Sequence, residues 1–215
     1  MAQPALSAVQ LDVWSDYVCP FCYLEMPELA RLAAAHGDRL TITWRAFELR
    51  PDPVPTLDPD GEYLHRVWGQ SVYPMAAARG MELRLPPVQP RSRAAFEAVA
   101  FAREQGRFDA MHEALFRAFF VEGRDLARRE VLVDIGASAG LDRQALDAAL
   151  ASGRFLEGVL QDEHDAAELG LRGVPAMVAS HAGAAVASHA GSAERLHLGG
   201  AQPFAALDAM VRQLL

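Results

Sequence analysis

Residues 9–22 read VQLDVWSDYVCPFC, and this stretch decides the fold. Apolar and polar side chains alternate from residue 9 to residue 15, which is typical of a β-strand. Cys19 and Cys22 follow within one helical turn of each other, and Pro20 suits the first turn of a helix because its missing N–H costs nothing there. The stretch therefore predicts a strand that runs directly into a helix, with both cysteines at the junction.

The helix is predicted to continue to about His36, because Gly37 is a typical residue for its end. Alternation returns over residues 41–47 and predicts a second strand. A helix between two strands forms a β-α-β unit, so we expect these two strands to be parallel.

The next part of the chain is predicted to be a helical block. Prolines cluster in residues 50–61, as in a linker. From residue 62 to about residue 170, apolar side chains recur at three- and four-residue spacings, which is typical of helices with a buried face. We interpret residues 57–170 as a helical insertion.

Strand patterns return after this block. They cover residues 176–179 and 196–198, and an amphipathic helix over about residues 203–214 closes the chain. The order of elements predicts a small α/β domain that is discontinuous in sequence, formed by residues 1–56 and 171–215.

The composition excludes several classes of function. The 215 residues include 20 Arg, no Lys and 28 Asp or Glu, with a formal charge of −8 at pH 7, so we expect no nucleic-acid partner. The absence of Lys excludes Schiff-base chemistry and a Walker-type phosphate loop, since both need an amine. The chain has no run of about 18 apolar residues, so we expect no membrane-spanning helix and no membrane partner.

The cysteine count and the N-terminal residues bear on location. Residues 1–10 contain neither a basic region nor a long apolar core, so no signal peptide is predicted. The expected location is the cytoplasm, where thiols are mostly kept reduced. Two cysteines are too few for a disulfide scaffold or a four-thiolate metal site. The pair is therefore expected to be reactive or metal-binding.

The position of the pair favours thiol–disulfide exchange. The first N–H groups of a helix are unpaired and its dipole is positive at that end, and both effects stabilise a thiolate on Cys19. Cys22 lies one turn further along, where we expect it to be more buried and protonated. Cys19 would form a mixed disulfide with a substrate, and Cys22 would resolve it. Pro20 and the helix start predict an exposed turn.

Two other interpretations of the cysteines stay open. The pair could be half of a metal site completed by histidines, although His181, His189 and His197 lack the spacing of ligands. The cysteines could also be buried and inert.

Gly173-Val174-Pro175 stands immediately before a predicted strand. A bond before proline at a strand entrance is a candidate cis peptide, which would expose the backbone of Val174 beside Cys19 for pairing with a substrate strand. A trans proline as the first residue of a strand is the alternative.

These elements, in this order, resemble the DsbA-like thioredoxin-fold family. Several stretches are similar to its cytoplasmic FrnE-like branch of dithiol–disulfide isomerases, linked to polyketide biosynthesis. The matching stretches are residues 15–23 (SDYVCPFCY), 44–51 (WRAFELRP), 118–123 (AFFVEG), 169–175 (LGLRGVP) and 200–203 (GAQP).

The resemblance implies a thioredoxin-like fold with a large helical insertion and a cis bond before Pro175. It implies Cys19 as nucleophile and Cys22 as resolving thiol. It implies that substrates contact the loop of Val174 and Pro175. Pro20 and Phe21, within the cysteine motif, are further candidates for substrate contact. The expected partners are proteins or peptides with disulfides, and glutathione or thioredoxin-system thiols are candidate redox partners. No cofactor and no metal ion are expected.

The chain also departs from its relatives. Phe21 stands where periplasmic DsbA has a histidine that stabilises the reduced thiolate, so we expect a less oxidising protein. Kappa-type glutathione transferases and 2-hydroxychromene-2-carboxylate isomerases share this scaffold and commonly have Ser where Cys19 stands. An enzyme of that kind is the first alternative function. A redox-sensing or metal-holding interaction protein is the second.

The sequence gives weaker indications for four further side chains. Asp16 and Glu25 flank the cysteines and could tune their redox chemistry, but solvated surface charge is the favoured interpretation. Trp68 and Tyr73 lie in the predicted insertion, where a role in a substrate groove is one interpretation and ordinary packing the other.

Overall fold

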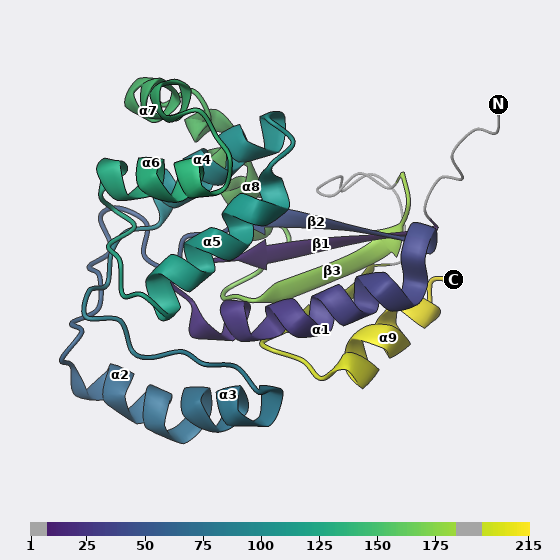
Figure 1. Cartoon of the computed structure of the whole chain (residues 1–215). Helices are drawn as coiled ribbons and strands as arrows, with labels where there is room; N and C mark the ends of the chain where they lie inside the picture. Colours follow the sequence, from purple (N-terminus) through teal and green to yellow (C-terminus); the bar gives the residue numbers. More distant parts are fainter. Residues whose placement is uncertain (1–7, 184–194) are drawn as a thin grey trace.

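The computed structural model describes residues 8–183 and 195–215. Four strands of this part of the chain form one mixed sheet in the order β2-β1-β3-β4 (Figure 1). They are β1 (Val9–Ser15), β2 (Leu40–Ala46), β3 (Ala176–His181) and β4 (Arg195–Gly199). β1 pairs in parallel with β2 and antiparallel with β3, and β3 pairs antiparallel with β4. The predicted parallel pair is confirmed, although its second strand begins and ends one residue earlier than expected.

In the described part of the chain, some helices pack around the sheet and the others belong to the segment between β2 and β3. Those around the sheet are α1 (Pro20–His36), the short 3₁₀ helix η1 (Gly37–Arg39), α8 (Leu156–Glu168) and α9 (Phe204–Arg212). The others are α2 (Glu62–Val67), the π-helix η2 (Trp68–Val72), α3 (Tyr73–Arg79), α4 (Arg93–Glu104), α5 (Phe108–Phe120), α6 (Arg129–Ser138) and α7 (Arg143–Ser152).

The sheet lies between two layers of helices, and β1 is buried on both faces because its successive side chains point to opposite sides. Leu11 and Val13 of β1 pack with Leu32 of α1 and Leu207 of α9 in one buried cluster. Trp14 points to the other face and donates its indole N–H to the carbonyl oxygen of Asp162 in α8, at 2.8 Å. Figure 1 shows α1 and α9 together on one side of the strands, with α8 across from them.

The ends of α1 are set by the residues that the sequence singled out. Pro20 is its first residue, and Cys19 stands in extended backbone as the N-cap. Gly37 ends the helix with a positive φ of 53°, and its N–H bonds the carbonyl oxygen of Ala33. A residue without a side chain adopts that backbone conformation at no steric cost.

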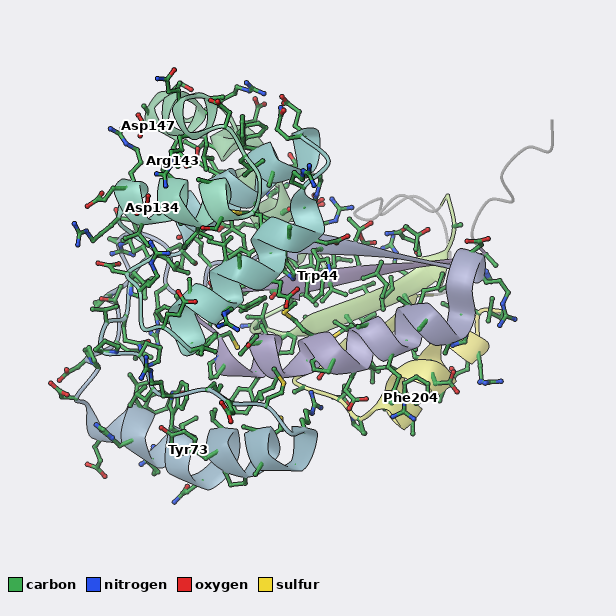
Figure 2. The ribbon with its side chains drawn as sticks, in the orientation of Figure 1. Trp44, Tyr73, Asp134, Arg143, Asp147 and Phe204 are labelled. Carbon is green, nitrogen blue, oxygen red and sulfur yellow. The ribbon has the colours of Figure 1, made fainter. Side chains whose placement is uncertain are left out.

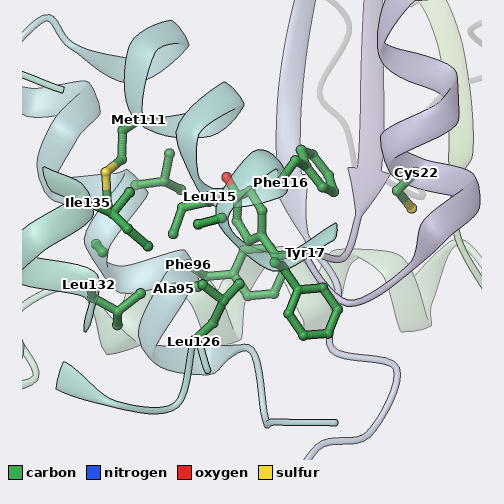
Figure 3. Packing of buried hydrophobic residues seen from close by; sticks show 14 of the residues in the cluster. Tyr17, Cys22, Ala95, Phe96, Met111, Leu115, Phe116, Leu126, Leu132 and Ile135 are labelled. Atoms are coloured by element: carbon green, nitrogen blue, oxygen red, sulfur yellow. The ribbon is translucent and has the colours of Figure 1, made fainter. Parts of the chain in front are cut away.

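Helices α2 to α8 occupy the chain between β2 and β3. Figure 1 shows α4 to α7 on one side of the N-terminal end of α1, and α2 and α3 on the other. An aromatic core fills the first group, where Phe116 and Phe119 of α5 are fully buried (Figure 3). The boundaries of the discontinuous domain, placed near residues 56 and 171 from the sequence, stay a prediction.

The tetrapeptide Ser-His-Ala-Gly occurs at residues 180–183 and again at residues 188–191. The second copy, like most of the loop over residues 180–195, lies outside the described residues. Among the helices that the structure describes, none is long and apolar enough to cross a membrane.

Candidate active site

The two cysteines lie where β1 gives way to α1. Cys19 is the N-cap of α1 and Cys22 stands in its first turn, with the Cys22 N–H bonded to the Cys19 carbonyl oxygen at 3.1 Å. Both are free thiols. The Cys19 thiol donates to the carbonyl oxygen of Val174, with 3.5 Å between sulfur and oxygen. The bond between Val174 and Pro175 is cis, as the resemblance implied.

Cys19 is not on an exposed turn. It is only 3% exposed, so the predicted exposure is wrong. The burial of Cys19 has a long-range cause. Residues of α2, η2 and the loop at residues 86–90 line the same cavity as the start of α1, and no residue of the cysteine motif predicts their position.

Cys19 nevertheless forms part of the wall of a cavity of about 420 Å³. Pro20, Phe21 and Val174 line the same cavity, together with side chains from residues 49–68 and 86–90, Phe120 and Arg172. We call this cavity the Cys19 pocket. Four of the six predicted site residues thus meet there, while Cys22 and Pro175 are buried and do not line it.

Cys22 differs from Cys19 in its surroundings. Its side chain is fully buried next to the aromatic core (Figure 3). Burial, together with the adjacent Cys19 sulfur, raises the pKa of the Cys22 thiol well above its ordinary value. Cys22 therefore keeps its proton at neutral pH, as expected from the sequence, whereas Cys19 borders an open space.

The helix start does not act on Cys19 quite as the sequence suggested. The Cys19 side chain makes no capping hydrogen bond with the first N–H groups of α1. Its sulfur instead faces the carbonyl oxygen of Val174. The dipole of the 17-residue helix α1 is still positive at its N-terminus, which favours negative charge there.

Asp16 is a structural carboxyl rather than a solvated surface charge, so the favoured interpretation of it was wrong. It is fully buried, and its two oxygens accept the N–H groups of Val18 at 3.2 Å and Leu49 at 2.7 Å. Burial raises its pKa to about 6, against the lowering effect of these hydrogen bonds. Asp16 thereby ties the loop before Cys19 to the segment after β2, and both segments line the Cys19 pocket.

Glu25 is also buried, which corrects the same interpretation. It is 0% exposed and pairs with Arg79 of α3 at 2.8 Å, while the Gln202 N–H bonds the same carboxyl oxygen at 3.0 Å. Arg79 also donates to the carbonyl oxygens of Leu24, at 2.5 Å, and Gln202, at 2.7 Å. This cluster joins α1, α3 and the segment before α9. Burial raises the pKa of Glu25, and Arg79 opposes the rise.

Of the two aromatic residues of the predicted groove, one lines the Cys19 pocket and the other does not. Trp68 is buried and lines the Cys19 pocket. Tyr73 contacts the Trp68 ring edge-on, with centroids 5.3 Å apart, but is 43% exposed on α3 and does not line the pocket (Figure 2).

Among the pocket residues that sequence reasoning missed are two arginines, Arg50 and Arg172. The order and direction of the strands could have indicated both arginines. Parallel β1 and β2 end at one edge of the sheet, and antiparallel β3 begins there. Residues shortly after β2 and shortly before β3 therefore gather around the end of β1, where Cys19 stands.

The metal interpretation finds no ligand set in the described part of the chain. There, no group of three or more His, Cys, Asp or Glu side chains is placed to hold a metal ion. His181 ends β3 and His197 lies within β4, and His189 falls outside the described residues.

The sheet, the helix that begins after Cys19 and the helices between β2 and β3 define a thioredoxin-like α/β protein with a helical insertion. The model of the DSBA-like thioredoxin domain family matches residues 10–207, and the chain belongs to this family. The fold class and the resemblance to the DsbA-like family are thus confirmed.

Similar proteins agree with this assignment. The uncharacterized protein YwbO of Bacillus subtilis (strain 168) is 32% identical over 174 residues, which cover 79% of this chain and 86% of YwbO. The structure of the probable DsbA oxidoreductase SCO1869 from Streptomyces coelicolor has a TM-score of 0.74 at 27% identity, covering 96% of this chain and 89% of that one. A 2-hydroxychromene-2-carboxylate isomerase shares the fold with a TM-score of 0.74 at 21% identity, covering 95% of each chain.

Proposed function

We propose that the protein is a thiol–disulfide oxidoreductase in which Cys19 attacks and Cys22 resolves. The observation that carries this proposal is the difference between the two thiols. Cys19 borders a cavity that a disulfide could enter, while Cys22 lies behind it with a raised pKa. Only Cys19 is placed to meet a substrate sulfur first. Membership of the DSBA-like family supports the same chemistry.

The reaction has two exchange steps. The Cys19 thiolate attacks one sulfur of a substrate disulfide, which forms a mixed disulfide and releases one substrate thiolate. The Cys22 thiol then loses its proton and attacks the Cys19 sulfur, which closes the Cys19–Cys22 disulfide and releases the second thiolate. Two electrons pass from the protein to the substrate, and the reverse sequence oxidises a dithiol.

We assign Pro20, Phe21 and Val174 to substrate contact, and the buried Pro175, expected from the resemblance to contact substrate as well, to a supporting place next to Val174. Pro20, Phe21 and Val174 line the Cys19 pocket, and a cis bond joins Val174 to Pro175. The proposed substrates are proteins or peptides with disulfides. Glutathione or thioredoxin-system thiols would be the redox partners in the cytoplasm, as the resemblance to the FrnE-like branch implies.

The equilibrium potential against glutathione decides the direction of electron flow. A value near about −270 mV, that of thioredoxin, would make the protein a reductase. A value near about −120 mV, that of DsbA, would make it an oxidant.

The test is insulin reduction in the presence of dithiothreitol, together with trapping. Cys19→Ala should abolish the activity, and Cys22→Ala should accumulate a mixed disulfide on Cys19 that mass spectrometry of the acid-quenched protein detects. A Cys19→Ala protein that is folded and as active as the original would contradict the proposal. So would a Cys22→Ala protein that never retains substrate.

A second candidate is favoured by the shared fold with the 2-hydroxychromene-2-carboxylate isomerase. An enzyme of that kind, or a kappa-type glutathione transferase, would need only one reactive residue at the start of α1, at the position of Cys19, and no resolving thiol. Glutathione-dependent conjugation or isomerisation by Cys22→Ser separates the two. Full activity in this variant would favour the second candidate, and loss of exchange without gain of these activities favours the first.

A further inference from the structure

The Cys19 pocket combines apolar walls with two positive charges. Most of its lining is aliphatic, aromatic or proline, and no Asp or Glu side chain lines it. Arg50 enters from the segment after β2, and Arg172 enters from the segment before β3. The pocket is thus positively charged, whereas the whole chain has a formal charge of −8.

Neither guanidinium is used by the protein itself. Within residues 8–183 and 195–215, the side chains of Arg50 and Arg172 have no hydrogen-bond or ion-pair partner. Arg50 is half-buried and Arg172 is exposed. Other half-buried arginines are paired, for example Arg45 with Asp12 at 2.9 Å and Arg79 with Glu25 at 2.8 Å. Two unpaired guanidinium groups in the lining of the pocket that Cys19 also lines are therefore available to a ligand.

Guanidinium groups and carboxylates match in geometry, because two parallel N–H donors meet two carboxylate oxygens. The pocket volume of about 420 Å³ also suits a small molecule better than a folded chain. The walls from α2, η2 and the 86–90 loop limit access to Cys19 from that side.

We propose that the Cys19 pocket selects small disulfides whose thiol halves carry carboxylate groups, and that Arg50 and Arg172 bind those carboxylates. This inference rests on the proposed exchange chemistry and narrows its substrate class. Glutathione disulfide belongs to the class by its chemistry. The Cys19 thiolate attacks one sulfur of such a disulfide, one carboxylate-bearing thiolate leaves, and Cys22 displaces the second.

Three disulfides of matched chain length provide the test. They are 3,3′-dithiodipropionate, which is anionic, bis(2-hydroxyethyl) disulfide, which is neutral, and cystamine, which is cationic. The reduced full-length protein is mixed with each probe, and oxidation of the cysteine pair is followed in single turnover. The readout is the ratio of the second-order rate constants, anionic over neutral.

We expect the anionic probe to react about tenfold faster than the neutral one, and cystamine to be the slowest. Arg50→Gln and Arg172→Gln should each lower the ratio by roughly threefold, and the double variant should bring it close to about one. Arg39→Gln is the matched control, since Arg39 is exposed in η1 at the opposite end of β1. It changes the net charge equally and should keep the original ratio.

Two results would overturn the inference while the exchange function stands. One is equal rates for the anionic and neutral probes. The other is a preference that Arg39→Gln reduces as much as Arg50→Gln does, since the cause would then be net charge. If none of the three probes oxidises the reduced protein while insulin is still reduced, the inference alone fails. If insulin reduction is absent as well, the exchange function fails and the inference fails with it.

Discussion

The sulfur of Cys19 lies 3.5 Å from the carbonyl oxygen of Val174, although 155 positions separate the two residues in the chain. The sheet explains the contact. Trp14, near the end of β1, is paired with Ala176, the first residue of antiparallel β3. The residues that leave β1 and those that enter β3 therefore meet at one edge. The register of two strands places the loop of Val174 against the start of α1.

Phe21 lies between the cysteines and also lines the Cys19 pocket, so its replacement should change the redox equilibrium. Phe21→His introduces a side chain that becomes cationic below about pH 6.5 and stabilises the Cys19 thiolate of the reduced form. We expect the reduction potential to rise by about 30 mV or more at pH 6, and by less at pH 8. Equilibration with glutathione buffers measures it.

Phe21→Leu is the control for that change, because it removes the ring without adding charge. Its potential should stay near the original at both pH values. A Phe21→His potential that is unchanged, or changed equally at both pH values, would show that charge at this position does not reach the sulfur.

The sequence predicted the sheet and α1 well because their signals are local. Strand alternation, Pro20 at the helix start and Gly37 at its end each act within a few residues, and all three are observed. The burial of Cys19 could not be predicted in this way. It depends on α2, η2 and the 86–90 loop, which lie far along the chain.

The carboxyl groups Asp16 and Glu25 show the same limit. A lone carboxylate near a motif is usually solvated, and each of these two residues has a decisive partner far away in sequence. Asp16 is held by Leu49 and Glu25 by Arg79, contacts that cross 33 and 54 positions. Only the folded chain shows that both carboxyl groups are buried and hydrogen-bonded.

Breaking the contact between Arg79 and Glu25 should be strongly destabilising. Arg79→Ala leaves the fully buried Glu25 carboxylate without its cation, and such a change costs about 3–5 kcal/mol of the free energy of unfolding. Urea unfolding at pH 7 measures it. Adding Glu25→Gln to Arg79→Ala should recover part of the loss, because no buried charge is then left unpaired. Additive losses in the double variant would contradict this account.

Asp16 should make the protein more stable as the pH falls from 7 to 4.5. Its pKa is raised from 3.8 to about 6 in the folded protein, so between these values the folded state binds a proton that the unfolded state releases. The stabilisation is present below the unfolded pKa and is lost as the pH rises through about 6. Relative to Asp16→Asn, the original protein should gain about 2 kcal/mol over this range.

Urea unfolding of both proteins at each pH gives that difference. The control is Asp38→Asn, because Asp38 is exposed in η1 and its replacement should leave the pH dependence as it was. If Asp16→Asn parallels the original protein at every pH, the buried carboxyl does not titrate in this range.

His112 should have the opposite effect on the pH dependence. It is buried in α5, where its Nδ1 lies 2.8 Å from the Tyr17 hydroxyl and its ring lies 4.3 Å from that of Trp44, between centroids. Burial, with a smaller contribution from the Arg103 charge, lowers its pKa from 6.5 to about 3. The neutral ring therefore stabilises the fold above pH 6.5, and this stability is lost as the pH falls towards 3 because only the unfolded state takes up the proton.

His112→Gln keeps a polar partner for Tyr17 but cannot titrate in this range, so it isolates the effect of the proton. Between pH 7 and pH 4 the original protein should lose about 3 kcal/mol relative to this variant. Urea unfolding at both pH values measures the difference, and Tyr17→Phe, which keeps the titrating ring, should retain the loss. A variant that loses stability with acid as steeply as the original would place the acid-sensitive group elsewhere. Because Asp16 and His112 act with opposite signs, the original protein should respond to acid less steeply than the His112 effect alone requires.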